Sequence, residues 1–258
     1  MAQTTDYILD NTWGKARRRL GLIEQLYDAA TMESLRATGI APGWRCLEVG
    51  AGAGSIARWM CDVVGPAGSV TAVDLEPTLL REQPRPNLEI VQADVTAAPL
   101  PGEAYDLVHA RGLLVHLPDR ESVITSMLRC LRPGGVIVLE EPDFGPMDMS
   151  ENASFVEFCR GMASSAAARG GDWYWARRLP AALAAVAVDV SASCRVGMFR
   201  GGALQAELMR LTVEQMAPLL EADGIDRERI EEVYAALENP TAWFSGFAEV
   251  TASGRRSG

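Results

Sequence analysis

The feature that most constrains the fold is a regular alternation of short apolar runs and helix-like segments between residues 45 and 140. Strands are predicted where β-prone residues form these runs, at residues 45–49, 69–74, 88–92, 105–109 and 136–140. Because helix-like segments separate the runs, we expect the strands to lie parallel and to be joined by right-handed crossovers. The fold class is therefore α/β.

Helical periodicity elsewhere predicts the layers that cover this sheet. Residues 13–38 have helical spacing, and Asp28 or Thr31 could cap a second short helix there. Further helices are predicted at residues 55–64, 119–131, 152–168, 175–187, 203–222 and 226–237, and further strands at 188–196 and 244–252. We expect a Rossmann-like, doubly wound, mostly parallel seven-stranded sheet with helical lid additions. Residues 1–42 would form an N-terminal helical cap, and residues 43–258 the main domain, with lid insertions at about 144–172 and 198–240.

Charge limits the classes of partner. The 258 residues include 34 acidic and 24 basic side chains, a formal net charge of −10. Nucleic-acid binding depends on basic groups that face phosphates, so neither nucleic acid nor an anionic membrane surface is an expected partner. The longest apolar stretch, residues 181–188, is less than half the length of a membrane span, and we find no signal peptide. We therefore expect a cytoplasmic protein that binds small molecules.

The cysteines are odd in number and widely scattered, at Cys46, Cys61, Cys130, Cys159 and Cys194. None forms a close pair with metal-ligand spacing, and two histidines leave little to complete a zinc site. The sequence predicts reduced, mostly buried thiols and no metal.

A glycine-rich turn, Gly50-Ala51-Gly52-Ala53-Gly54, follows the first predicted strand directly. Glycine lacks Cβ, so the backbone can approach a ligand closely and adopt positive φ. The helix that follows offers free N–H groups at its start. The turn alone is a weak signal, because dinucleotide-binding enzymes share it.

Three carboxylates make the prediction sharper. Glu48, Asp74 and Asp94 end the first three predicted strands, at the edge where open α/β sheets bind ligands. At these positions Glu48 can receive a ligand ammonium group, and Asp74 can accept both hydroxyls of a ribose. Asp94, with apolar neighbours on both sides, suits the amino group of an adenine.

Five motifs extend this pattern in order from about residue 43 to 143: LEVGAGAG (47–54), TAVD (71–74), VQAD (91–94), YDLVHARGLLVHLPD (105–119) and LRPGGVIVLEEPD (131–143). Together they resemble the class I S-adenosylmethionine-dependent methyltransferases, in the small-molecule group that includes the ubiquinone/menaquinone-biosynthesis type. The resemblance implies a methyltransferase domain in residues 43–258. It also implies transfer of a methyl group from S-adenosyl-L-methionine to a small organic acceptor, with release of S-adenosyl-L-homocysteine.

The resemblance also implies roles for the cofactor-binding residues. Glu48, Gly50 and Gly52, with Ala51 between the glycines, would hold the methionine part, Asp74 the ribose, and Asp94 the adenine. Leu75 and Val95 would enclose the base, and Arg111 would lie beside the cofactor. Two alternatives stay open: a non-catalytic S-adenosylmethionine-binding protein and an NAD-dependent oxidoreductase. Against the latter, Ser55 stands where the dinucleotide fingerprint has glycine or alanine.

The acceptor side is less readable. His116 follows the fourth strand and is the candidate base, although it could simply pack its turn. Glu140 and Glu141 end the fifth strand, and we expect one of them, with Glu141 as the candidate, to face the acceptor unless it caps or ion-pairs. His109 is interpreted as a packed core residue. We expect oxygen as the acceptor atom, with nitrogen or carbon as alternatives. The oligomeric state is left open.

Aromatic and basic clusters outside the motifs are also candidates for acceptor binding. Trp173-Tyr174-Trp175, and Trp13 with Tyr7, suit a pocket for a planar or lipophilic acceptor, or ordinary packing. The run Arg17-Arg18-Arg19 is most simply a solvated helix face, with an anionic substrate tail as the alternative partner.

Overall fold

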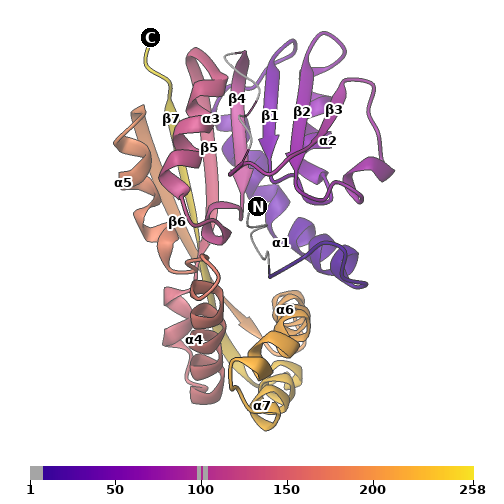
Figure 1. The fold of residues 1–258 in the computed structure, drawn as a ribbon, viewed down its shortest axis with the longest axis vertical. Coiled ribbons are helices and arrows are strands. Elements are labelled where there is room, and N and C mark those ends of the chain that lie inside the picture. Colours follow the sequence, from indigo (N-terminus) through magenta and orange to yellow (C-terminus); the bar gives the residue numbers. More distant parts are fainter. Residues whose placement is uncertain (1–7, 98–99, 101–103) are drawn as a thin grey trace.

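The computed structural model describes residues 8–97, 100 and 104–258, and their strands form one seven-stranded sheet in the order β3-β2-β1-β4-β5-β7-β6 (Figure 1). The strands are β1 (Arg45–Val49), β2 (Ser69–Asp74), β3 (Leu88–Gln92), β4 (Tyr105–Arg111), β5 (Leu131–Asp143), β6 (Val188–Arg200) and β7 (Trp243–Arg255). Strands β1 to β5 pair in parallel, and β7 runs antiparallel to both β5 and β6. The predicted fold class is confirmed.

The helices of the described residues are α1 (Ala16–Ala37), α2 (Ser55–Val64), α3 (Arg120–Cys130), α4 (Ala153–Ala167), α5 (Leu179–Ala184), α6 (Leu204–Ala222) and α7 (Arg227–Glu238). Four 3₁₀ turns join them: η1 (Leu80–Glu82), η2 (Leu114–His116), η3 (Gly145–Met149) and η4 (Trp175–Arg178). Residues 1–7 of the proposed N-terminal cap lie outside the described residues.

Several predicted boundaries are wrong: β5, β6 and β7 end three to four residues later than expected, and three further differences have identifiable causes. Helix α1 is continuous, because Asp28 and Thr31 bind Arg111 with their side chains and do not cap a second helix. Strand β5 begins at Leu131 because that residue already pairs with Tyr105, across a register shift. Helix α5 begins only at Leu179, after the 3₁₀ turn η4 and directly before Pro180, which suits a first helical turn.

Successive side chains of the strands point to opposite faces of the sheet and pack into two apolar layers, as expected for a sheet with helices on both faces. On one face, Cys46, Val70 and Leu107 pack with helix α2 and with Leu35 of α1. On the other face, Leu47, Val108 and Ile137 pack with helices that include α3 and α5. Because both faces of the central strands β1, β4 and β5 are covered, a ligand can approach these strands only at their ends.

The carboxyl end of the sheet is the place for such a ligand. Strand order reverses at β1, which lies between β2 and β4, and open α/β sheets form their binding crevice at such a reversal. In Figure 1, α1 and α6 lie beyond this end of the strands, and α4 and α7 lie further out along β6 and β7. Leu22 of α1 packs against Leu208 and Leu211 of α6, which joins the two helices into one roof.

The structure agrees with the expectation of free, mostly buried thiols. All five cysteines are free, and four of them are buried, whereas Cys194 is exposed. Among the described residues, no cluster of three or more His, Cys, Asp or Glu side chains is arranged to hold a metal ion. No helix in the described part of the chain is long and apolar enough to cross a bilayer.

Candidate active site

A cavity of about 370 Å³ lies at the carboxyl end of the sheet, walled by the strand ends, α1, α6 and β7. All of the residues predicted to bind the cofactor line it: Glu48, Gly50, Ala51, Gly52, Asp74, Leu75, Asp94, Val95 and Arg111. Both catalytic candidates, His116 and Glu141, line it too. The structure therefore brings the sequence-predicted site residues into one space.

The glycine turn shapes the floor of this cavity. Gly50, Gly52 and Gly54 all have positive φ, of 74°, 56° and 87°. At Gly54 a Cβ would lie 2.2 Å from Leu80 Cδ1, so the turn can pack against η1 only with glycine there. Gly54 also precedes the first residue of α2, so the N–H groups at the start of that helix follow the turn directly.

Two of the three carboxylates are held by neighbouring N–H groups and keep further acceptor capacity. Asp74 accepts from the N–H of Gly52 at 2.7 Å with one oxygen and from the N–H of Glu76 at 2.9 Å with the other. Burial raises the pKa of Asp74, although these N–H groups oppose the shift. Asp94 uses one oxygen to accept from Thr96, at 2.8 Å from the backbone N–H. Each carboxylate oxygen has two lone pairs, so a ribose or an adenine amino group can still donate to these side chains.

The third carboxylate, Glu48, belongs to a buried charged group around His109. His109 Nδ1 lies 2.7 Å from Glu48 Oε2, and its Nε2 lies 3.4 Å from Glu140 Oε2. Burial opposes the charge on this imidazole, but the two glutamates outweigh it and raise the pKa of His109 to about 9. Burial likewise opposes ionisation of Glu140, whereas His109, Thr31 and Arg111 favour it and lower its pKa to about 2. His109 is thus a buried cation that fixes one oxygen of Glu48.

Arg111 ties the roof helix to the sheet. It donates to Asp28 Oδ1 at 2.8 Å and to Thr31 Oγ1 at 2.9 Å, both on α1. Thr31 in turn donates to Glu140. One chain of polar contacts therefore runs from α1 through Glu140 and His109 to Glu48, and it holds α1 over the cavity.

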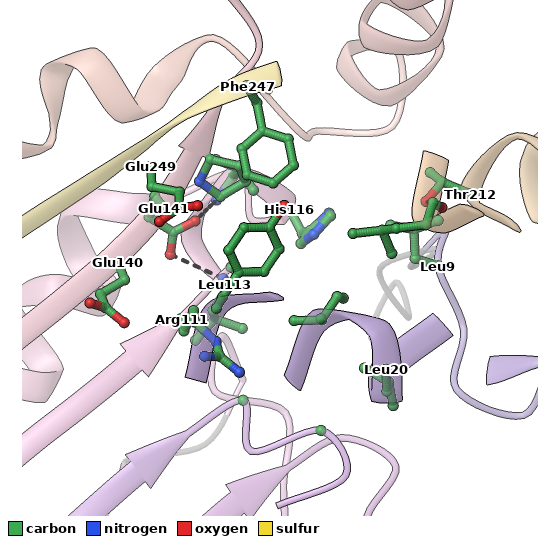
Figure 2. A pocket seen from close by; sticks show the side chains of 18 of the residues that line it. Leu9, Leu20, Arg111, Leu113, His116, Glu140, Glu141, Thr212, Phe247 and Glu249 are labelled. Atoms are coloured by element: carbon green, nitrogen blue, oxygen red, sulfur yellow. Dashed lines mark hydrogen bonds between the residues drawn. The ribbon is translucent and has the colours of Figure 1, made fainter. Parts of the chain in front are cut away.

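Glu141 has a structural use that its position in the sequence does not reveal. Its carboxylate accepts from the backbone N–H groups of Leu113, Leu114 and Val115 at 3.0, 2.8 and 3.2 Å, and so holds η2 in place (Figure 2). Burial raises the pKa of Glu141 to about 7, against the effect of these N–H groups. Of the two glutamates, Glu140 ion-pairs and Glu141 caps, the alternative roles left open for them.

His116, in η2, lies between the acidic strand ends and the apolar end of the cavity. Figure 2 shows it between Glu140, Glu141 and Glu249 on one side and Leu9 and Thr212 on the other. Burial, together with the positive charges of Arg19 and Arg120, lowers the pKa of His116 to about 3. The ring is therefore neutral at pH 7, able to accept a proton or a hydrogen bond, but weakly basic.

An aromatic wall leads away from His116. Trp173 meets the His116 ring edge-on with centroids 6.3 Å apart, and Phe144 lies 4.6 Å from Trp173. Phe247 lies 5.8 Å from Phe144, and Tyr27 lies 5.5 Å from Phe247. All five rings line the cavity, which suits a planar or lipophilic ligand.

Of the expected aromatic residues that the structure describes, Trp173 lines the cavity, whereas Trp13, Tyr174 and Trp175 do not. Trp175 is buried beneath Arg120, and Trp13 packs on the apolar side of α1, so both follow the packing alternative. Tyr7 lies outside the described residues. Sequence reasoning missed Phe247 and Glu249 on β7, and Thr212 on α6, because no local motif marks them. A spacing of four on α1 (Arg19, Ile23, Tyr27 and Thr31, all lining the cavity) was a usable signal.

Comparisons with known proteins agree with this geometry. Residues 47–139 match the family described as a methyltransferase domain. The ubiquinone/menaquinone biosynthesis C-methyltransferase UbiE of Ectopseudomonas mendocina is 32% identical over 129 residues, 46% of this chain and 49% of that protein. The chain thus aligns with about half the length of this curated relative.

Solved structures share the fold over most of the chain. BH2331 from Bacillus halodurans has a TM-score of 0.58 at 16% identity, and the match covers 88% of this chain and 98% of that one. Haemonchus contortus phosphoethanolamine N-methyltransferase 2, solved with S-adenosyl-L-methionine, has a TM-score of 0.52 at 15% identity, with 98% and 56% covered. Residues 47–139 thus carry a methyltransferase domain that is similar to the ubiquinone/menaquinone biosynthesis C-methyltransferases, and the solved structures show the same fold over most of the chain.

Proposed function

We propose that the chain transfers a methyl group from S-adenosyl-L-methionine to a small organic acceptor in the cytoplasm and releases S-adenosyl-L-homocysteine. The observation that carries this proposal is the convergence of Glu48, Asp74 and Asp94 with the glycine turn on one cavity that also holds His116. A site with three carboxylates favours a ligand with a positive charge and several donor groups. An acceptor atom of oxygen remains our expectation, with nitrogen or carbon as alternatives.

The residues present fit this donor. His109 engages one oxygen of Glu48, which leaves the other oxygen for the ammonium group of the methionine part. The turn at Gly50, Ala51 and Gly52 lets the backbone approach that part closely, while its own N–H groups bond to Val73 and Asp74. Asp74 accepts from the ribose hydroxyls and Asp94 from the adenine amino group. Leu75 and Val95 enclose the base, and Arg111 holds α1 down over the donor.

The chemistry needs alignment more than strong acid–base help. Bound S-adenosyl-L-methionine supplies a methyl group on a sulfonium, which is an activated leaving group. The chain's contribution is to hold the acceptor in line with that methyl group and to exclude water, effects worth about 7–11 kcal/mol in well-aligned systems. The neutral His116 is placed to accept a hydrogen bond or a proton from the acceptor.

Ligand titration tests the proposal against its rivals. Calorimetric titration with S-adenosyl-L-methionine, S-adenosyl-L-homocysteine and NAD should show binding of the first two and none of NAD. Incubation with methyl-labelled donor and host extracts should then yield a labelled small molecule. Donor binding without any labelled product would favour a non-catalytic binding protein, and NAD binding without donor binding would favour an oxidoreductase.

The role of His116 makes a separate prediction. His116→Ala should lower the single-turnover rate of methylation by about 10- to 100-fold, at the low end of general-base effects because the ring is a weak base. His116 itself should give no inflection near pH 6.5, since a group whose pKa is about 3 does not titrate there. An inflection near pH 7 that persists in His116→Ala belongs to Glu141, whose pKa is about 7. Rates measured from pH 5 to 9 check both points. An unchanged rate in the variant would remove His116 as the proton acceptor.

A further inference from the structure

The three consecutive arginines of α1 do not share one environment. The side chains of Arg17 and Arg18 are at least half-exposed. Arg17 pairs with Glu82, and Arg18 pairs with Glu207, with Arg18 Nε 2.8 Å from Glu207 Oε1. Arg19 points the other way, is 3% exposed and lines the cavity. The helical turn thus gives two arginines to solvent and one to the site.

Within the described part of the chain, Arg19 is a buried cation that pairs with no carboxylate. Its Nη2 donates to the backbone carbonyl of Leu9 at 3.2 Å. Among residues 8–97, 100 and 104–258, no carboxylate forms an ion pair with it, and its Nε has no hydrogen-bond partner. An unpaired buried guanidinium is costly for folding, because its desolvation is not repaid by an opposite charge. Such a group is typical of a position that binds an anion from solution.

A second donor in the same wall is also unsatisfied. Trp173 is 2% exposed, lines the cavity, and its Nε1 finds no acceptor in the described part of the chain. The Trp173 ring meets the His116 ring edge-on, and the charge of Arg19 reaches His116 and lowers its pKa. Arg19 and Trp173 therefore line the same cavity as His116, and both offer N–H groups that a ligand oxygen can accept from.

The surroundings of these donors define the rest of the ligand. Large apolar side chains from η3, α6, β7 and two loop positions share the cavity with them: Leu9, Phe144, Met147, Leu208, Met209 and Phe247. The carboxylates Glu48, Asp74 and Asp94 lie at the strand ends, whereas Arg19 comes from α1. A cavity with carboxylates on the strands and a guanidinium on α1 can take a cationic methyl donor together with an anionic partner.

We propose that Arg19 and Trp173 bind the carboxylate of the methyl acceptor, and that the acceptor is an otherwise apolar or aromatic carboxylic acid. This inference rests on the proposed function, since it assigns the second substrate of the same site. Arg19 donates to one or both carboxylate oxygens, and Trp173 donates from Nε1. The aromatic wall from Trp173 to Tyr27 packs against the apolar body.

Matched acids and amides test the charge directly. The probes are 3-phenylpropionate, cinnamate and octanoate, each compared with its amide, titrated calorimetrically into the full chain with and without saturating S-adenosyl-L-homocysteine. For at least one pair, we expect the acid to bind wild-type protein at least about 10-fold more tightly than the amide, the effect of one charge-assisted contact. In Arg19→Met the preference should fall below about twofold.

Arg18→Met is the matched control, because it removes the same charge one residue away, outside the cavity. It should keep the preference for the acid. Trp173→Phe retains a ring and removes only the N–H donor, so it should reduce the preference by about threefold to tenfold. The melting temperature of Arg19→Met should be equal to or above that of the wild type, because the change removes an unpaired buried charge. A merely structural arginine would lower it.

The proposal is overturned if wild-type protein binds no acid more tightly than its amide, or if Arg19→Met keeps the preference. Titration with S-adenosyl-L-homocysteine alone separates this failure from failure of the proposed function. If S-adenosyl-L-homocysteine does not bind, the proposed methyltransferase function is wrong. The difference in affinity between acid and amide, measured without S-adenosyl-L-homocysteine, still decides the role of Arg19.

Discussion

Replacing His109 with leucine is expected to lower the free energy of unfolding by about 3–5 kcal/mol, the usual cost of removing one partner from a buried ion pair. His109 is 0% exposed and lies between Glu48 and Glu140, which are themselves buried. Leucine keeps the side-chain bulk but leaves two carboxylates without their cation. Urea unfolding followed by circular dichroism measures the loss, and a variant within about 1 kcal/mol of the wild type would contradict the assigned charge.

The same histidine should make stability depend on pH. Its pKa is raised from 6.5 to about 9, so its stabilising contribution is fully present below pH 6.5 and is lost as the pH rises through about 9. The size of this loss is about 3 kcal/mol, from about 1.4 kcal/mol for each unit of pKa. The triple variant His109→Leu, Glu48→Gln, Glu140→Gln carries no buried charges at these positions. It should recover stability relative to the single variant and show no such loss between pH 6.5 and 9.

Replacing Asp74 with alanine is expected to weaken binding of S-adenosyl-L-homocysteine by about 10²- to 10⁴-fold. The reason is the loss of two charge-assisted hydrogen bonds to the proposed ribose, each worth about 1.5–3 kcal/mol. The change also removes the acceptor that holds the Gly52 N–H at 2.7 Å, so the glycine turn loses its anchor to the end of β2. Both effects act on the donor and neither acts on the acceptor.

Calorimetric titration of the folded variant measures this effect. Asp62→Ala is the matched control: Asp62 lies on α2, is largely exposed and pairs with Arg85 outside the cavity. Its affinity should stay within about twofold of the wild type, as expected for an exposed ion pair. If Asp74→Ala bound S-adenosyl-L-homocysteine as tightly as Asp62→Ala does, the proposed placement of the ribose would be wrong.

Much of the sheet was predictable because its signals are local. Runs such as SVTAVD and VIVLE are too apolar for anything but buried strands, and Pro or Gly follows or precedes most of them. The glycine turn fixed the carboxyl end of β1, and the strand endings then placed Glu48, Asp74 and Asp94 together. These residues need only the topology of neighbouring strands, which the βα alternation already implies.

The acceptor side depends on contacts between distant parts of the chain. Glu140 and Glu141 are adjacent in sequence, yet one faces His109 and Thr31 and the other faces the N–H groups of η2 on the opposite side of the strand. The two glutamates have different partners because successive side chains of β5 point to opposite faces of the sheet. The sequence pattern does not indicate which glutamate contacts which partner. His109 is buried, as expected. Its charge depends on Glu48 of β1 and Glu140 of β5, and the residue pattern of the sequence does not indicate that these side chains contact it.

The cavity joins two stretches of different character. Its acidic end comes from the matched residues 47–139, whereas Arg19, Met209 and Phe247 come from α1, α6 and β7, outside them. Since Arg19, Met209 and Phe247 lie outside the matched residues, substitutions at these positions can alter which molecule is accepted while the contacts to the donor stay intact. Homologous enzymes can in this way share one methyl donor and differ in the molecule that they methylate. Sequence similarity within the matched segment therefore does not identify the methyl acceptor.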